Sequence, residues 1–402
     1  MAAVATVIRL AGIAESVSDT RVPWTSPQFQ VIVLSSLMGV MGVSLISPAL
    51  PTVREALAIT DGQAALLVTA FTVPGIVLAP LVGVFADRYG RRAVLVPCLI
   101  GYGVSGAAVA LTTDFTVILG LRVLQGVAGS ALVTLAVTLI GDLYDAGQRN
   151  HLMGVNGAAI SVGTASYPLV GGALASVSWR APFLLYIVGV PVGLVAYRSL
   201  DDGDGRAHGL DYFRNALAAV PTRRTAALYA TYVAAFVVLY GTLITAVPFL
   251  LHEAYGLGSF GTGLVLTSAS AMTAVTASQN GRLSGLASND RLVALGFVGY
   301  GVGLVGAYFA GSPVAFAVAI LAFGAGQGVV QPSIDTATSS LVSAEFRGGV
   351  MSFRTTAIRT GQTLGPPLAT AADAVIGYRA FLLAVGVVAL AAGAVAAVLV
   401  AE

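Results

Sequence analysis

The sequence predicts an all-α integral membrane protein whose twelve transmembrane helices form two pseudo-symmetric six-helix bundles. Three observations predict this fold: an apolar composition, regularly spaced apolar stretches, and a repeat at about half the chain length. Hydrophobic residues make up 57% of the 402 residues, and the mean hydropathy is +0.89, whereas a soluble domain is about 45–50% apolar. A helix needs about 20 apolar residues to cross a bilayer, so the chain is long enough for about a dozen crossings.

Apolar stretches bounded by charge, glycine or proline define the expected spans. In the first half they are 28–50, 64–85, 93–111, 115–140, 152–177 and 183–197. In the second half they are 226–251, 262–279, 292–310, 314–334, 349–371 and 381–400. We therefore expect an N-terminal segment over 1–27, bundles over 28–198 and 225–402, and a charged linker over 199–224.

Arginines predict the orientation, because cytoplasmic loops of membrane proteins carry an excess of basic residues. With a cytoplasmic N-terminus, the outside loops hold only Arg54, Arg180 and Arg379. The inside segments hold 14 arginines: Arg9, Arg21, Arg88, Arg91, Arg92, Arg149, Arg198, Arg206, Arg214, Arg223, Arg224, Arg282, Arg291 and Arg347. We expect a multi-pass protein of the cell membrane with both termini in the cytoplasm. The formal charge of +2 is too small to indicate nucleic-acid binding.

Cysteine and histidine give no indication of a metal site or a cofactor, and we expect neither. The single cysteine, Cys98, excludes an intrachain disulfide and is interpreted as a packed helix residue. The three histidines, His151, His208 and His252, are too scattered to predict a metal site. Residues 1–27 contain no long apolar core before a small-residue cleavage site, so we do not expect a cleaved signal peptide.

The two halves repeat one another. The sequence Gly-Tyr-Gly-Val at 101–104 returns 198 residues later at 299–302. The same shift relates Arg149, Met153, Gly163 and Pro168 to Arg347, Met351, Gly361 and Pro366. Gln-Gly at 125–126 returns at 327–328, a shift of 202 residues. Separate matches near half the chain length favour duplication, and two six-span repeats in the same orientation would form two related bundles.

A dense group of charges separates the second and third spans. Positions 83–92 read Gly-x-x-x-Asp-Arg-x-Gly-Arg-Arg in a chain that is only 9% charged. The pattern predicts a very short basic turn, in which glycine permits tight bends and arginines stay at the cytoplasmic surface. A basic anchor alone is the simpler interpretation, but it needs neither the aspartate nor the glycines. The segment resembles the signature between the second and third helices of the major facilitator superfamily of transporters.

This resemblance implies alternating access and a gating role for the segment. The gating residues are Gly83, Asp87, Arg88, Gly90, Arg91, Arg92 and Asp142. By the resemblance, Asp87 faces the positive N-terminal end of the eleventh helix, near Gly348 to Met351, and Arg91 pairs with Asp142. Such contacts would join the bundles on the cytoplasmic side in the outward-open state. The second half keeps only Gly-Arg-Leu-Ser-Gly at 281–285, without a matching aspartate. These cytoplasmic contacts would therefore be asymmetric between the halves.

Two arginines fall inside expected spans. Arg122 lies about 10 Å from the outer end of the fourth span and Arg359 about 15 Å into the eleventh. A mid-membrane arginine costs about 2.5–3.5 kcal/mol on insertion scales, so neither should face lipid. Positions 122–129 resemble the family's fourth-helix motif and would aim Arg122 at a central cavity, although backbone carbonyls could instead hold it for packing. For Arg359 the alternative is a structural salt bridge. We assign the translocation path to Arg122, Gln125, Gln327, Gln331, Arg359 and Gln362.

Glycine and proline form a motif in the fifth span. Positions 163–172 resemble the motif of antiporter branches of the superfamily, which mostly export drugs or other organic compounds, although Tyr167 replaces the usual glycine. Proline removes a helix hydrogen bond and glycine allows close helix contact, but both residues are common in membrane helices anyway. We expect bends or helix interfaces at Gly163, Pro168, Gly171, Gly172, Gly361, Gly365 and Pro366.

These motifs favour a secondary carrier that exports small organic or drug-like compounds in exchange for protons, and that acts as a monomer in the lipid bilayer. The candidate proton carriers are Asp142, Asp335 and Glu253, all near the ends of spans. A carrier for an organic anion is the alternative, because the deep charges Arg122 and Arg359 are both positive.

Other classes of membrane protein lack their required residues. A membrane-embedded enzyme needs catalytic residues clustered at membrane depth, and the spans contain no such cluster of His, Asp, Glu or Cys. A retinal-type receptor needs a lysine, and the chain has none. ATP-driven transport by this chain alone needs a Gly-x-x-x-x-Gly-Lys loop, which is also missing.

Overall fold

A computed structural model describes residues 22–201, 223–340 and 347–399, and within these ranges the chain is helical without any strand. The first half contains α2 Pro27–Ser44, η1 Ser47–Ala49, α3 Leu50–Leu57, α4 Asp61–Tyr89, α5 Arg91–Ala108, η2 Val109–Leu111, α6 Phe115–Leu143, α7 Ala146–Val177, α8 Ala181–Leu184, η3 Leu185–Val188 and α9 Gly189–Ser199. The second half contains α11 Arg223–Val238, η4 Leu239–Ala246, α12 Val247–Tyr255, α13 Ser259–Ser278, α14 Asn280–Leu283, α15 Asn289–Phe309, α16 Pro313–Ser340 and α17 Arg347–Leu399. Most of the expected linker over 199–224 lies outside the described residues.

The described helices include 11 stretches long and apolar enough to cross a membrane. The last of them, Phe353–Ala397, consists of two helices joined at a bend. Gly377 forms this bend with a φ of 78°, a backbone conformation that glycine adopts without steric cost. The chain therefore passes twelve times through the helical body, as the sequence predicts.

Several helices begin at the polar residues that the sequence places before each apolar stretch. Thr60 caps α4, and Gln63 completes a capping box by accepting a hydrogen bond from the Thr60 backbone N–H. The side chains of Asp114, Asp145 and Ser288 cap α6, α7 and α15 by accepting hydrogen bonds from backbone N–H groups of the first turn. Because each cap satisfies backbone N–H groups that have no partner inside the helix, it fixes where the span begins.

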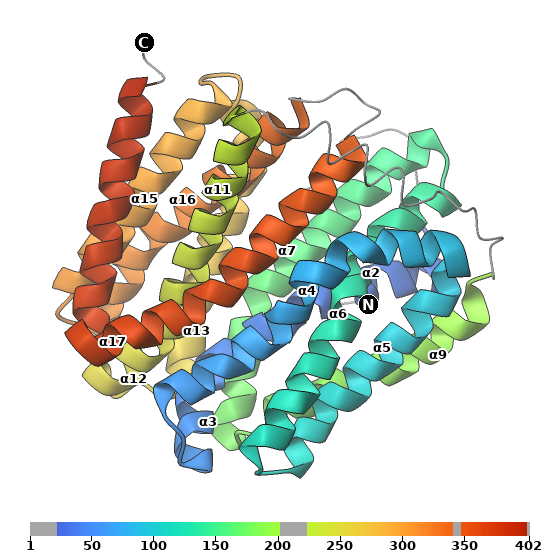
Figure 1. Ribbon diagram of the computed structural model, residues 1–402, viewed down its shortest axis with the longest axis horizontal. Helices are drawn as coiled ribbons and strands as arrows, with labels where there is room; N and C mark the ends of the chain where they lie inside the picture. Colours follow the sequence, from blue (N-terminus) through green and yellow to red (C-terminus); the bar gives the residue numbers. More distant parts are fainter. Residues whose placement is uncertain (1–21, 202–222, 341–346, 400–402) are drawn as a thin grey trace.

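The two halves lie side by side, with the first half in blue to green and the second in yellow to red (Figure 1). They meet along two helix pairs, α4 with α17 and α7 with α13. These are the second span with the eleventh and the fifth span with the eighth. The internal repeat exchanges the second span with the eighth and the fifth with the eleventh, so it relates one interface to the other.

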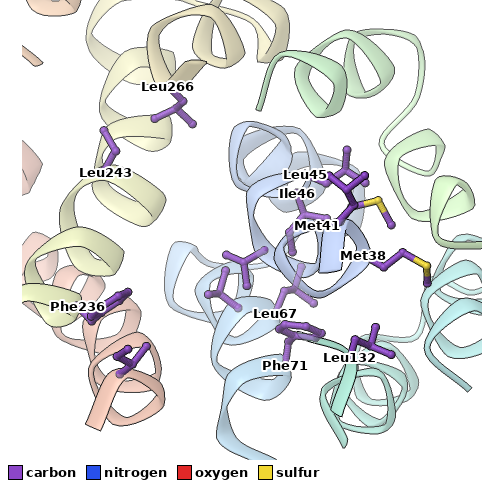
Figure 2. Packing of buried hydrophobic residues seen from close by; sticks show 14 of the residues in the cluster. Met38, Met41, Leu45, Ile46, Leu67, Phe71, Leu132, Phe236, Leu243 and Leu266 are labelled. Carbon is purple, nitrogen blue, oxygen red and sulfur yellow. The ribbon is translucent and has the colours of Figure 1, made fainter. Parts of the chain in front are cut away.

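Buried apolar residues form one cluster that includes residues of both halves. In the first half, residues of α2, α4 and α6, including Met41, Phe71 and Leu132, belong to it (Figure 2). Phe236 and Leu243, on α11 and η4 of the second half, belong to the same cluster. The apolar core is therefore continuous across the interface between the halves.

Three elements differ from the sequence prediction. The expected turn over 83–92 is wrong in extent, because α4 stays helical to Tyr89 and α5 begins at Arg91. The turn is Gly90 alone, with a φ of 92°. The chain also remains helical past the expected end of the first span, through α3, so Arg54 lies on a helix and not in a loop. Third, residues 239–246 in the seventh span are π-helical, which the apolar pattern does not reveal.

Candidate functional site

One end of the molecule, which we call the Arg54 end, carries a charged cluster that crosses between the halves. Nη1 of Arg54 lies 2.7 Å from Oδ1 of Asp61 in the same half and 2.6 Å from Oε1 of Glu253 on α12. Nε2 of His252 lies 2.8 Å from Oε1 of Glu55, which also joins the halves. Tyr378, next to the bend of α17, donates a hydrogen bond from its hydroxyl to Oδ2 of Asp61 at 2.8 Å. These contacts fasten α3 and α4 to α12 and α17.

Polar contacts continue along the interface between α4 and α17. The Thr363 hydroxyl donates to that of Thr72 at 2.9 Å. Further from the Arg54 end, the Thr356 hydroxyl donates to the Ile76 carbonyl at 3.3 Å. The two helices are thus hydrogen-bonded from the Arg54 end to about the middle of α4.

The opposite end, which we call the Arg91 end, has a different arrangement. Arg91 donates from Nε to Oδ2 of Asp142 at 2.9 Å, pairs with Oδ1 of Asp87 at 2.5 Å, and donates to the Ala86 carbonyl at 2.8 Å. The pair of Arg91 with Asp142 that the resemblance implies is confirmed. However, all of these partners belong to the first half, so the pair does not join the bundles in this structure. The expected contact of Asp87 near Gly348 to Met351 lies outside the residues whose side chains are described.

The remaining motif residues have separate surroundings. Gly83 lies within α4 with open space beside it, so it does not form the tight bend expected there. Arg92 stacks over the ring of Tyr197 at 4.3 Å, and Arg88 lies 5.4 Å from the ring of Tyr89. These two cations contact aromatic rings within the first half.

Arg122 does not line an open cavity, contrary to the sequence prediction. It is fully buried in α6 and donates to the Leu67 carbonyl at 3.0 Å, the Gly42 carbonyl at 2.8 Å and Oε1 of Gln125 at 2.6 Å. Its guanidinium also stacks over Phe71 at 4.7 Å. The alternative interpretation, an arginine held by backbone carbonyls, is the one observed. Arg122 ties α2, α4 and α6 together.

The second half contains a partly buried ion pair that includes a residue missed by the sequence analysis. Arg354 donates from Nε and Nη2 to the two oxygens of Asp335 at 2.5 and 2.7 Å. The Tyr232 hydroxyl also donates to Asp335. The three residues come from α17, α16 and α11, so this cluster ties three helices together. An arginine inside the stretch 349–371 was the available signal, and it was overlooked beside Arg359.

Arg359 lies where the two halves touch. Nη1 donates to Oε1 of Gln362 at 2.9 Å, one turn further along α17. The side chain rests on Gly75, and a Cβ at that position would lie 2.9 Å from both Cδ and Nε of Arg359. Gly75 is the middle residue of α4. Arg359 therefore reaches from the second half to the midpoint of a helix in the first.

The four predicted glutamines separate into three groups, of which Gln362 with Arg359 is one. Gln125 holds Arg122, whereas its own buried Nε2 has no hydrogen-bond partner in the described structure. Gln327 accepts a hydrogen bond from Tyr300 and donates to Gln331 at 3.4 Å. The structure therefore does not bring the six predicted path residues together into a single site.

The glycine and proline motifs lie at helix crossings. A Cβ at Gly172 would overlap the Ser259 carbonyl of α13, and a Cβ at Gly263 would overlap the Pro168 carbonyl of α7. Gly171 has the same relation to the Leu45 carbonyl, where α7 approaches the end of the first span. Backbones cross there without intervening side chains.

The corresponding motif of the second half also lies at a crossing. Gly361 approaches the Val233 carbonyl of α11, Gly365 approaches the backbone of Gly241 in η4, and Pro366 lies inside α17. In the first half, Gly163 approaches Leu37 of α2. Both motifs therefore allow the fifth or eleventh span to approach the first span of its own half.

The family is decided by the whole sequence. A sequence model of the major facilitator superfamily matches residues 32–284 and 228–402. The chain belongs to the major facilitator superfamily. Its twelve passes, its paired halves and the Asp87 to Arg92 segment are those of a member of this superfamily.

Curated relatives within the superfamily match part of the chain. The bacillibactin exporter of Bacillus subtilis (strain 168) is 33% identical over 162 residues, 38% of this chain and 40% of that protein. The class B tetracycline resistance protein of Escherichia coli is 31% identical over 159 residues, 39% of this chain and 39% of that protein. The chain thus matches about two fifths of the length of these relatives.

Solved structures show the same fold over nearly the whole chain. A bacterial homolog of the human lysosomal transporter Spinster, in an inward-facing and unoccupied conformation, superposes with a TM-score of 0.73 at 17% identity, covering 94% of this chain and 95% of that one. The human organic anion transporter MFSD10 (TETRAN) superposes with a TM-score of 0.68 at 19% identity, covering 94% of this chain and 100% of that one.

Proposed function

We propose that the protein is a secondary transporter that exports small organic compounds by alternating access in exchange for protons. The observation that carries this proposal is the position of the ion pairs. Among the described residues, those that cross between the halves involve Arg54 and His252, at the Arg54 end. Those at the Arg91 end stay within one half. A carrier that alternates needs a state joined at one end only, and this arrangement is suited to that state.

Export is supported by the relatives. The bacillibactin exporter and the tetracycline resistance protein are named for the export of, or resistance to, small organic compounds. Membership of a transporter superfamily favours transport over catalysis. On the arginine distribution, we propose that the Arg91 end and both termini face the cytoplasm. The state described here then opens towards the cytoplasm, where an exporter loads its substrate.

The bodies that would move are the two bundles. We place their boundaries at 28–198 and 225–402, with 199–224 as the linker between them. Each bundle has its own polar cluster, around Arg122 in the first half and around Arg354 in the second, so each is suited to moving as a unit. We propose that a single chain carries out the cycle, because both bundles and both interfaces lie within it.

Asp335 is the favoured proton carrier of the three candidates. Its carboxylate is the counter-ion of Arg354 between three helices of the second half. In the proposed cycle, protonation removes this counter-ion and so changes the contacts among the three helices. Asp142 and Glu253 lie at the two ends of the molecule and bind arginines there.

The experiment is dye accumulation in inside-out membrane vesicles energised to acidify their interior. We expect vesicles that contain the protein to accumulate ethidium or carboxyfluorescein faster than empty vesicles, and to release it when nigericin collapses the pH gradient. Accumulation that persists after the collapse would contradict proton exchange. If vesicles with the protein accumulated cationic, neutral and anionic dyes no faster than empty vesicles, that result would contradict export of small organic compounds.

A further inference from the structure

Three arginines lie deep in the described spans, and their hydrogen-bond partners differ. Arg122 donates to two carbonyls and an amide oxygen. Arg354 forms a bidentate pair with the carboxylate of Asp335. Arg359 has one acceptor within the described residues, Oε1 of Gln362 at 2.9 Å. A guanidinium carries five N–H donors, so most of the donors of Arg359 are available to a further acceptor.

The position of Arg359 makes those donors accessible from the interface between the halves. Unlike Arg122, which is fully buried, Arg359 is partly exposed. Its side chain lies on Gly75, at the midpoint of α4 in the other half. Because glycine has no side chain, it leaves room for the guanidinium between α17 and α4. Arg359 therefore contacts both halves, at the depth where a carrier holds its substrate.

The groups around Arg359 are polar but uncharged. Those that interact with it electrostatically are the phenols of Tyr240, from the second half, and Tyr102, from the first. Tyr240 lies in η4, the π-helical part of the seventh span, and π-helical segments occur frequently at functional sites. Among the described residues, no carboxylate neutralises this cation. Because an isolated charge at this depth is unfavourable, a counter-ion from outside the chain would stabilise it.

The geometry points to Arg359 as the binding site for the carboxylate group of an organic anion that the protein carries. A guanidinium and a carboxylate form two parallel charge-assisted hydrogen bonds, and few other side chains recognise a carboxylate as specifically. Gln362 orients the guanidinium, and the phenols of Tyr240 and Tyr102 interact with it electrostatically. This inference rests on the proposed transport function, and it names the chemical class of the substrate.

The test measures binding to the purified full-length protein in phosphatidylcholine nanodiscs. The anionic probes are carboxyfluorescein and 1-pyrenebutyrate, and the cationic probe is ethidium. The variants are Arg359→Gln, Arg359→Lys and Ser161→Ala. Ser161 is the matched control because it occupies the position of Arg359 in the repeat, is exposed, and donates only to the Gly157 carbonyl of its own helix.

We expect the parent to bind at least one anion saturably. Arg359→Gln should weaken that binding at least tenfold, which corresponds to about 1.4 kcal/mol. Arg359→Lys should retain part of it, because lysine keeps the charge but not the fork of donors. Ser161→Ala should bind like the parent. Ethidium binding should change less than twofold in Arg359→Gln.

The inference is overturned if the parent binds neither anion, or if Arg359→Gln binds the anion within twofold of the parent. It is also overturned if Arg359→Gln weakens anion and ethidium binding equally, since that result indicates a structural role. Thermal unfolding of each variant checks its fold. A Gly75→Ala variant adds a check that keeps the charge: its Cβ should displace the arginine and weaken anion binding alone. Ethidium transport in the vesicle assay, together with absent anion binding, would reject this inference and leave the proposed function standing.

Discussion

The two halves hold the arginines inside their spans in different ways. In the first half Arg122 is stabilised by backbone carbonyls, an amide and an aromatic ring, and none of these partners is charged. In the second half Arg354 is stabilised by the carboxylate of Asp335. Under the proposed proton exchange, only the second arrangement would change with protonation. On that proposal, the first half is the fixed body and the second half is the switchable one.

The largest effect expected from this comparison is the loss of the fixed cluster. Arg122→Ala removes three hydrogen bonds and leaves a buried cavity between α2, α4 and α6, so it should destabilise the first half by about 3–5 kcal/mol. Thermal unfolding in detergent measures the loss. Arg122→Lys should fall between this variant and the parent, because an ammonium cannot reach all three acceptors. An Arg122→Ala protein that unfolds at the temperature of the parent would show that the cluster does not hold the half together.

The next effect concerns the switchable pair. Asp335→Asn keeps an oxygen for Tyr232 but cannot change charge, so gradient-driven transport should fall at least tenfold. Exchange of labelled substrate without a gradient should persist, because it needs no proton. Asp290→Asn is the matched control, since Asp290 pairs with Arg224 at the exposed surface. If Asp335→Asn lost gradient-driven transport and exchange equally, Asp335 would have a structural role and would not couple transport to protons.

A smaller effect is expected at the Arg54 end. Glu253→Gln removes the ion pair with Arg54, one of the contacts that cross between the halves, but leaves Arg54 paired with Asp61. The Glu253 side chain is 45% exposed, so the pair contributes at most about 1 kcal/mol, or about a fivefold change in population. Spin-label distances across the Arg54 end should lengthen in a larger fraction of molecules. An unchanged distance distribution would indicate that the cluster does not hold this end closed.

The smallest effect is expected at the Arg91 end. Asp87→Asn should leave folding intact, because its partner Arg91 keeps Asp142. It should slow transport about threefold, since the carboxylate would stabilise the state in which this end closes. Transport rates in proteoliposomes measure this change, with Asp290→Asn at the exposed surface as the control. If Asp87→Asn transported at the rate of the parent, Asp87 would have no role in gating.

Composition and spacing were sufficient to predict the fold. The twelve passes follow from apolar stretches and caps such as Thr60, which are local signals. The surroundings of Arg122 could not be predicted, because helical spacing shows which residues share a face but not which neighbouring helix covers it. The position of Arg354 inside the eleventh span was visible in the sequence, but its pairing with Asp335 depends on a contact between helices and could not be predicted. The apolar pattern of the seventh span does not distinguish a π-helical stretch from an α-helix. The pairing of Arg91 with Asp142 was available only through the family resemblance.

The crossing of Gly172 with Gly263 has a mechanical consequence. The two backbones touch close to the Arg54 end, so the remainder of α7 acts as a long lever arm. From Gly172 to Ala146 the helix extends about 39 Å at 1.5 Å per residue, so a rotation of about 10° about this crossing displaces the far end by roughly 7 Å. A displacement of that size exceeds the width of a benzene ring. A small rotation of α7 against α13 about the crossing of Gly172 and Gly263 could therefore open the opposite end of the molecule.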